Sequence, residues 1–358
     1  TDAQAEDLYT DETTTTAATL DFPSGAGCIA AYQLDGNGND ISGNYNGTTT
    51  DIGYTGLQFK PDLVWVKQRS SPDRGHILSN SMSSSSSANS LAFMSSQNAE
   101  REYTGAEANG AYIRTLDSNG FSVGSSNFTG ASGEDYVAWC FKAAASTTTI
   151  TGSGSQIGSD VRANVDAGFS IFTYDGATNA TADTSNNGGG YYSVGHGLGV
   201  APALVIVKKT SGAGSWYVGG TALGSSGTNG NHMVLNSAAK QVGEANILWG
   251  GGQTFNDTTF GLGAWDVVNR RNDSYVAYCF ANKSGYQKVG TYTGNGNTNG
   301  PIIYTTDNGA SGGANGFRPR FIIAKPISVA DNWSLWDNVR ETGDNLDQIL
   351  VPNNSGAE

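Results

Sequence analysis

The chain has 358 residues, a formal net charge of −13 at pH 7, 50 glycines, three histidines and 14% charged residues. Such an acidic chain does not offer the basic surface that nucleic acid requires, and it contains no apolar run long enough for insertion into a membrane. The many glycines, serines, threonines and asparagines are typical of short strands joined by tight turns, and no amphipathic helix pattern is visible. We therefore expect a nearly all-β fold.

The chain opens with a polar segment, and an internal repeat follows it. Residues 1–26 include four consecutive threonines and predict an extended N-terminal lead. Each of three later units begins with a glycine that stands 34 positions before a proline (61 minus 27, 202 minus 168, 319 minus 285): Gly27 and Pro61, Gly168 and Pro202, Gly285 and Pro319. The agreement of the three spacings indicates internal duplication.

Each proline introduces a predicted strand. Four or five apolar residues, mostly β-branched or aromatic, follow it, and a lysine stands six positions after it: Lys67, Lys208 and Lys325. Proline can open a strand, although it cannot donate a hydrogen bond to the sheet. An unbroken apolar run of this length fits a strand that is covered on both faces. We expect each lysine to end its strand and to pair locally.

The first two units end on nearly identical strands, Tyr-Val-Ala-Trp-Cys-Phe at 136–141 and Tyr-Val-Ala-Tyr-Cys-Phe at 275–280. Alternation places the tyrosine, alanine and cysteine on one face, and the valine, aromatic residue and phenylalanine on the other. Cys140 and Cys279 occupy equivalent positions in separate units, which is too far apart for a disulfide. We expect both to be reduced, small core residues rather than catalytic or metal-binding ones.

These patterns predict tandem β-sandwich repeats of jelly-roll or lectin-like type, the last one incomplete. The expected divisions are repeat 1 at 27–143, a linker or surface excursion at 144–167, repeat 2 at 168–283 and a partial repeat 3 at 284–358. Unit two spans 77 positions from proline to cysteine (279 minus 202), which would put the third closing strand near position 396. We expect residues beyond Glu358 or a neighbouring chain to complete the third unit.

One loop has the oxygen donors of a calcium site. Asp35, Asn37, Asn39 and Asp40 alternate as calcium ligands do, but position twelve of the loop is Asn46 instead of the glutamate of an EF-hand. A hydrogen-bonded turn formed by the Asx side chains is the alternative. Calcium is the one cofactor that we consider.

Aromatic residues recur behind the proline strands. Trp216 and Trp333 both stand 14 positions after their prolines (216 minus 202, 333 minus 319), and His76 stands 15 after its own. Together with Trp336, the two tryptophans could stack on a sugar ring or on a neighbouring chain. The alternative is that they anchor the core, since buried aromatic residues dominate the cores of β-sandwiches.

No pattern of catalytic residues is visible. The glycine runs at 188–190 and 250–252 are not followed by the Lys-Ser/Thr of a phosphate-binding loop, and the three histidines stand far apart in the repeats. No Gly-x-Ser-x-Gly turn precedes a helical pattern. We therefore do not expect an enzyme.

Several motifs resemble known proteins. Residues 28–37 and 41–48 resemble the opening of laminin-G-like, concanavalin-A-like lectin domains. Other segments are similar to the repeated units of large virion structural proteins, often labelled tail-fibre proteins, in tailed phages of marine bacteria: 61–67, 117–124, 136–142, 194–202 and 316–319. The resemblance implies a location in the virion and an array of β-sandwiches, and it supplies no catalytic residues.

The expected function is that of a virion structural protein, in a tail fibre, spike or capsid-surface fibre that contributes to host attachment. The expected partners are other virion proteins, host-surface glycans and further copies of the chain, with threefold symmetry implied by the resemblance. A carbohydrate-binding module of an adhesin or secreted protein is the first alternative. A capsid decoration protein without a ligand is the second.

Overall fold

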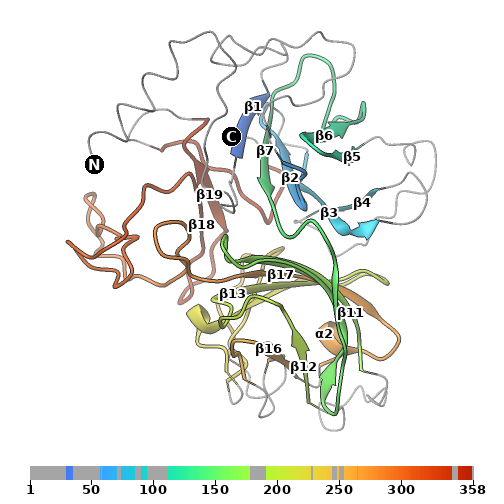
Figure 1. The fold of residues 1–358 in the computed structure, drawn as a ribbon. Helices are drawn as coiled ribbons and strands as arrows, with labels where there is room; N and C mark the ends of the chain where they lie inside the picture. The colour runs from blue at the N-terminus through green and yellow to red at the C-terminus, as the bar shows by residue number, and fades with distance from the viewer. Residues whose placement is uncertain are drawn as a thin grey trace, which may run out of the picture.

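The computed structural model confirms an all-β sandwich fold (Figure 1). Strands make up almost all the regular structure of the residues that it describes, beside the short helix α2 (Asp266–Asn269) and the 3-10 turn η1 (Thr221–Leu223). The described residues are 30–34, 57, 59–70, 74–84, 90–94, 112–177, 191–226, 229–243, 248–249, 254–263, 265–340 and 346–356.

The first sheet is antiparallel and has five strands. In spatial order they are β1 (Ala30–Leu34), β7 (Tyr136–Phe141), β2 (Leu63–Gln68), β3 (Ile77–Ser84) and β4 (Ser90–Met94). The predicted proline strand β2 lies beside the predicted closing strand β7, with Trp65 opposite Trp139. Both strands are buried along their whole length, as their unbroken apolar runs predict.

The second sheet has seven strands. In spatial order they are β15 (Met233–Val234), β14 (Trp216–Gly219), β13 (Leu204–Lys209), β17 (Ser274–Phe280), β11 (Phe169–Asp175), β10 (Ser159–Asn164) and β8 (Thr148–Ile150). The order β11-β17-β13-β14-β15 matches the order β1-β7-β2-β3-β4, and Ile206 lies opposite Tyr278 as Trp65 lies opposite Trp139. The superposition of the two units as whole repeats stays a prediction.

The segment at 144–167, predicted as a linker or surface excursion, contains regular strands at the edge of the second sheet. It contains β8, β9 (Gln156–Ile157) and β10, and β10 pairs along its length with β11. Only Ser159 and Val161 of β10 are buried, while the rest of the strand is exposed or half-buried. So polar a strand carries little hydrophobic periodicity, and its structure comes from backbone pairing with β11.

Smaller sheets cover the outer faces of the two large ones. The hairpin of β5 (Ile113–Asp117) and β6 (Gly120–Val123) packs on the first sheet, where Phe121 meets Val64, Ala138 and Cys140. The sheet of β16 (Thr259–Leu262), β12 (Tyr192–Gly195) and β9 packs on the second, where Phe260 meets Phe172 and Ala277. Cys140 and Cys279 are free and buried, as predicted.

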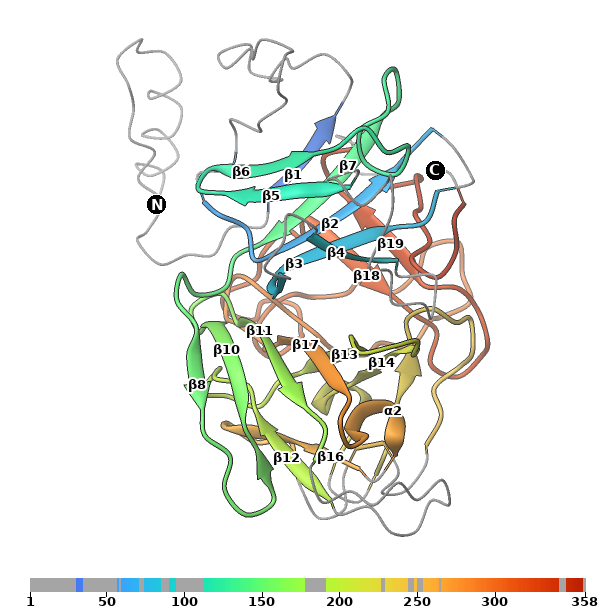
Figure 2. The same cartoon turned by 90° about the vertical axis from the view of Figure 1, so that its right-hand side faces the viewer.

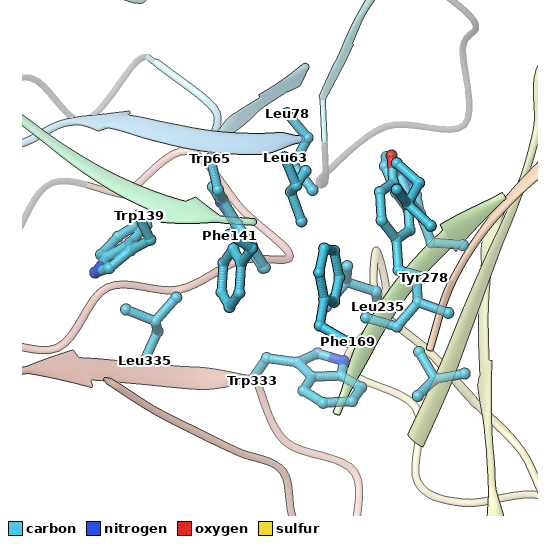
Figure 3. Close-up of a cluster of buried hydrophobic side chains, with 14 of the residues drawn as sticks. Leu63, Trp65, Leu78, Trp139, Phe141, Phe169, Leu235, Tyr278, Trp333 and Leu335 are labelled. Atoms are coloured by element: carbon cyan, nitrogen blue, oxygen red, sulfur yellow. The ribbon is translucent and has the colours of Figure 1, made fainter. Parts of the chain in front are cut away.

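The inner faces of the two large sheets meet in one central core. Figure 2 shows the first sheet above the second, and Figure 3 shows their side chains together with those of the hairpin of β18 (Phe321–Ala324) and β19 (Ser334–Asp337). The ring of Phe141 lies 5.6 Å from that of Phe169 and 5.9 Å from that of Phe321, measured between centroids. All three predicted units therefore contribute to this core.

The central core changes the argument for an oligomer. An unbroken apolar run needs cover on both of its faces, and a neighbouring chain is one way to supply that cover. In the structure the second sheet and the β18–β19 hairpin cover the inner face of the first sheet within one chain. Burial of these strands therefore gives no reason for a trimer, and the oligomeric state stays a prediction.

Candidate functional site

The predicted calcium ligands cannot be placed. Asp35, Asn37, Asn39 and Asp40 lie outside the described residues, so the calcium site stays a prediction. Within the described part of the chain, no group of three or more His, Cys, Asp or Glu side chains could hold a metal ion.

The predicted aromatic positions are structurally equivalent. Trp216 lies opposite Lys208 in the β13–β14 pair. The pair that follows Ala324 and Ser334 in the β18–β19 register is Lys325 with Trp333, and the pair that follows Val66 and Ile77 is Lys67 with His76. The extra residue before His76 is therefore taken up by the turn between β2 and β3. Each hairpin places a lysine opposite an aromatic ring at the same point.

The rings at these three points belong to the interior. Trp216, Trp333 and His76 are all buried, so they agree with the core-anchor alternative and offer no exposed platform for a sugar. The indole nitrogen of Trp333 donates to the carbonyl of Val234 at 3.0 Å, which ties the C-terminal hairpin to β15. Trp336 is half-buried and lies opposite Ile322, so among these tryptophans it alone keeps the prediction of a partner contact.

The three lysines stand near the ends of their strands, Lys67 and Lys208 one residue before the end and Lys325 just after it. The prediction of local pairing is confirmed for Lys67 and Lys208, whereas Lys325 Nζ donates to the carbonyl of the distant Ala238 at 3.2 Å as well as to that of Pro326 at 3.3 Å. Lys67 Nζ donates to the carbonyl of Gln68 at 2.6 Å, and Lys208 Nζ donates to that of Gly214 at 2.9 Å and lies 6.0 Å from the centre of the Trp216 ring. Both lysines are fully buried. Lys325 is only half-buried, and partial burial lowers its pKa. The lysines therefore hold the hairpin ends together and form no basic patch.

His76 stands in a buried polar cluster that also contains Trp65, Trp139, Asp337 and Arg340. The Trp65 indole nitrogen donates to His76 Nδ1 at 2.9 Å, and the His76 ring stacks on the Trp139 ring at 6.2 Å between centroids. Burial, then the positive charges of Lys67 and Arg340, lower the pKa of His76 well below its usual value. The imidazole is therefore neutral at pH 7, and its contacts make it part of the packing.

A buried ion pair completes this cluster. Arg340 Nε donates to Asp337 Oδ2 at 2.6 Å, and both side chains are shielded from solvent. Trp139 Nε1 donates to the same carboxylate oxygen at 3.3 Å, which links β7 of the first sheet to β19. Sequence reasoning missed this pair. Its only signal was an aspartate and an arginine three positions apart, which is a common pattern on protein surfaces.

The other histidines lie in separate loops. His196 Nδ1 accepts the backbone N–H of Leu198 at 3.2 Å, and burial lowers the pKa of its imidazole. His232 Nδ1 lies 3.0 Å from the carbonyl of Gly230, beside the rings of Tyr217 and Trp265. These contacts hold the imidazoles in place and bring neither of them together with His76. Through their hydrogen bonds, these polar groups join strands and loops of the fold.

Comparisons with known proteins give one match. The family model of a domain of unknown function, DUF7483, matches residues 41–358. No curated protein and no solved structure matches the chain. Among the described residues, no helix is long and apolar enough to cross a membrane.

Proposed function

We propose that this chain, which belongs to the DUF7483 family of domains of unknown function, is a structural component of a phage virion. Its place would be a tail fibre, a spike or a capsid-surface fibre that contributes to host attachment. The proposal rests on the resemblance of its repeated motifs to those of tail-fibre proteins and on the way in which the repeated hairpins pack.

The observation that carries the proposal is the central core. Residues as far apart in the chain as Trp65, Phe169 and Trp333 pack into one aromatic cluster, so two sheets and a hairpin act as a single body. Aromatic contacts of this kind stabilise the fold beyond the effect of the apolar area that they bury, and they oppose local unfolding. A particle component that must survive outside the cell benefits from such a body, which supports a structural role.

Charge is consistent with the same role. The net charge of −13 favours a soluble particle surface and disfavours adhesion to nucleic acid during assembly. The buried charged groups Lys67, Lys208 and Arg340 are engaged in hydrogen bonds within the fold. These buried polar groups thus hold parts of the fold together.

The test is to locate the protein in particles. Virions of the phage that encodes the chain are purified on a density gradient, washed with high salt and analysed by mass spectrometry, and antibodies against the chain are imaged on them by immunogold electron microscopy. We expect peptides of the chain in the washed particles and label on a fibre, spike or capsid surface. Recovery only from the soluble fraction of the lysate would overturn the proposal.

Attachment and symmetry are tested on the purified chain. Added protein should slow adsorption of the phage to host cells, and heat-unfolded protein at the same concentration should not. Light scattering should give three times the monomer mass if the threefold symmetry implied by the resemblance holds. Binding to a glycan array without any effect on adsorption would favour the carbohydrate-binding alternative.

A further inference from the structure

The β18–β19 hairpin packs on both large sheets, and its two contacts differ in chemistry. Toward the second sheet, the donors are main-chain groups of the turn, one indole and one lysine. The bonds are Gln241 N to the carbonyl of Ile327 at 3.1 Å, Asp331 N to that of Ala238 at 2.8 Å, Trp333 Nε1 to that of Val234 at 3.0 Å and Lys325 Nζ to that of Ala238 at 3.2 Å. None of these groups is a histidine or a carboxylate, the side chains that titrate between about pH 4 and pH 7.

The contact with the first sheet is aromatic and charged. This first-sheet contact is formed by Trp65, His76 and Trp139 on one side and by Phe321, Asp337 and Arg340 on the other. The Phe321 ring lies 6.4 Å from the Trp65 ring and 5.7 Å from the Trp139 ring, measured between centroids. The Trp139 indole also donates to Asp337, as described above. The two tryptophans therefore carry most of the contact from the side of the first sheet.

The geometry around His76 accepts only the neutral ring. Its Nδ1 accepts the indole N–H of Trp65 at 2.9 Å, so Nδ1 carries no proton. An imidazolium has a proton on both nitrogens, and a proton on Nδ1 would face the indole N–H. Nε2 forms no hydrogen bond of normal geometry with the described residues. Protonation of the ring therefore requires Trp65 to move, and Trp65 is in contact with the hairpin.

Charge acts in the same direction. Burial is the largest influence that lowers the pKa of His76, Lys67 and Arg340 follow, and the backbone of Val351 acts weakly in the opposite sense. The carboxylate of Asp337 is engaged with Arg340. Because Arg340 follows β19 and His76 precedes β3, repulsion between a protonated ring and the guanidinium acts across the first-sheet contact. Separation of the two sides relieves this repulsion and admits water to the ring.

We propose that protonation of His76 opens the first-sheet contact while the hairpin stays attached to the second sheet, which makes this contact an acid-sensitive joint of the fold. The two large sheets remain together through other groups: the ring of Phe141 packs on that of Phe169, and Asn80 Nδ2 donates to the hydroxyl of Tyr278 at 2.9 Å. Opening exposes the aromatic rings of the joint. The proposal concerns this contact alone and holds whether or not the chain is a virion protein.

The test compares two matched variants of the full chain, Leu335→Cys and Leu235→Cys. Both leucines are fully buried in the central core. The side chain of Leu335 points toward Trp139 (Figure 3), whereas Leu235 N donates to the carbonyl of Trp216 in the second sheet. The rate of labelling by a small thiol reagent is measured at pH 7.5 and 5.5 and divided by the rate for the urea-unfolded chain at the same pH. Mass spectrometry of the labelled peptides separates the new thiols from the native cysteines.

We expect the normalised rate at position 335 to rise about tenfold from pH 7.5 to 5.5, the most that one histidine of ordinary pKa in the open state contributes over this range. At position 235 the rise should stay below about twofold. His76→Gln keeps an oxygen for the Trp65 indole and takes up no proton, so in this background the rise at position 335 should also stay below about twofold. No rise at position 335, equal rises at both positions, or a rise that persists in His76→Gln would overturn the proposal.

A second measurement needs no cysteine substitution and applies if Leu335→Cys does not fold. In the parent chain, nuclear magnetic resonance follows the ring carbon of His76 and the indole N–H signals of Trp139 and Trp333. The signals of His76 and Trp139 should change together below about pH 6.5, and that of Trp333 should not change with them. Titration of His76 without a change at Trp139, no change at either down to pH 5, or a parallel change at Trp333 would overturn the proposal.

Discussion

The second sheet and the C-terminal hairpin carry the same sequence signature and differ in burial. In β13 the four central residues are buried, whereas all four residues of β18 are half-buried. Lys208 at the end of β13 is shielded from solvent, and Lys325 is not. The strand β17 accounts for the difference, because it flanks β13, whereas no strand among the described residues flanks β18 on that side. An apolar run specifies a strand, but the neighbouring strands decide how deeply it is buried.

The largest effect is expected where a complete sheet meets the incomplete hairpin. Trp139→Ala should lower the free energy of unfolding by about 3 to 5 kcal/mol, because it removes a fully buried ring and leaves a cavity. Trp336→Ala, on the half-buried face of the hairpin, is the matched control and should cost about 1 kcal/mol. Chemical denaturation measures both. Equal losses would show that the central core does not join the hairpin to the first sheet.

The next largest difference in stability is expected between substitutions of the glycines that begin the second and third units. Gly168 (φ 66) and Gly285 (φ 72) both adopt left-handed backbone conformations. A Cβ on Gly168 would lie 2.8 Å from the carbonyl oxygen of Ala281, whereas one on Gly285 would meet nothing nearer than 4.0 Å. Gly285→Ala should therefore cost only the conformational strain, about 1 to 2 kcal/mol, and Gly168→Ala should cost more. Thermal or denaturant unfolding of both variants measures the two losses. A larger loss for Gly285→Ala than for Gly168→Ala would contradict this expectation.

The lysines should show a smaller difference in the same direction. Lys208→Ala removes a buried stem and leaves the carbonyl of Gly214 without this donor, so we expect a loss of about 2 kcal/mol. Lys325→Ala acts at a half-buried position and should cost about 0.5 kcal/mol. Equilibrium unfolding in urea gives both values. If Lys325→Ala cost as much as Lys208→Ala, Lys325 would be as well shielded from solvent in the hairpin as Lys208 is in the second sheet.

The smallest effect is a pH dependence at the position where the first hairpin has His76 and the others have tryptophan. The folded state lowers the pKa of His76, so below about pH 6.5 the unfolded chain binds a proton that the folded chain does not. Stability should therefore fall as the pH drops below 6.5, by at most about 1.4 kcal/mol per pH unit from this group, and be unaffected by it above.

His76→Gln is the variant for this measurement. Its stability should change less between pH 7.5 and 5.5 than that of the parent chain, and the remaining slope should include His196, whose pKa burial also lowers. His196→Gln is the control at a site away from the central core. An unchanged slope in His76→Gln would show that the histidine is protonated or solvated in the folded protein.

Local patterns in the sequence were sufficient for the strands themselves. The runs after Pro61, Pro202 and Pro319 are strands β2, β13 and β18, and the alternation in the closing strands assigns their faces correctly. Within these strands Trp139, Val276 and Tyr278 are buried, as the apolar runs predict, although Leu204 is only half-buried. The side-chain period of a strand is short and local, so it can be read without knowledge of the rest of the fold.

Only the tertiary structure decided what covers each face and how the hairpin ends are used. Alternation shows that a strand has two apolar faces but does not identify the layer opposite, so the packing of the second sheet and the β18–β19 hairpin on the first could not be deduced. Three further features could not be deduced for the same reason: the polar strand β10, the burial of Lys67 and Lys208, and the pair of Asp337 with Arg340. Each depends on contacts between residues distant in the chain, and such contacts leave no local pattern for a reader of the sequence to find.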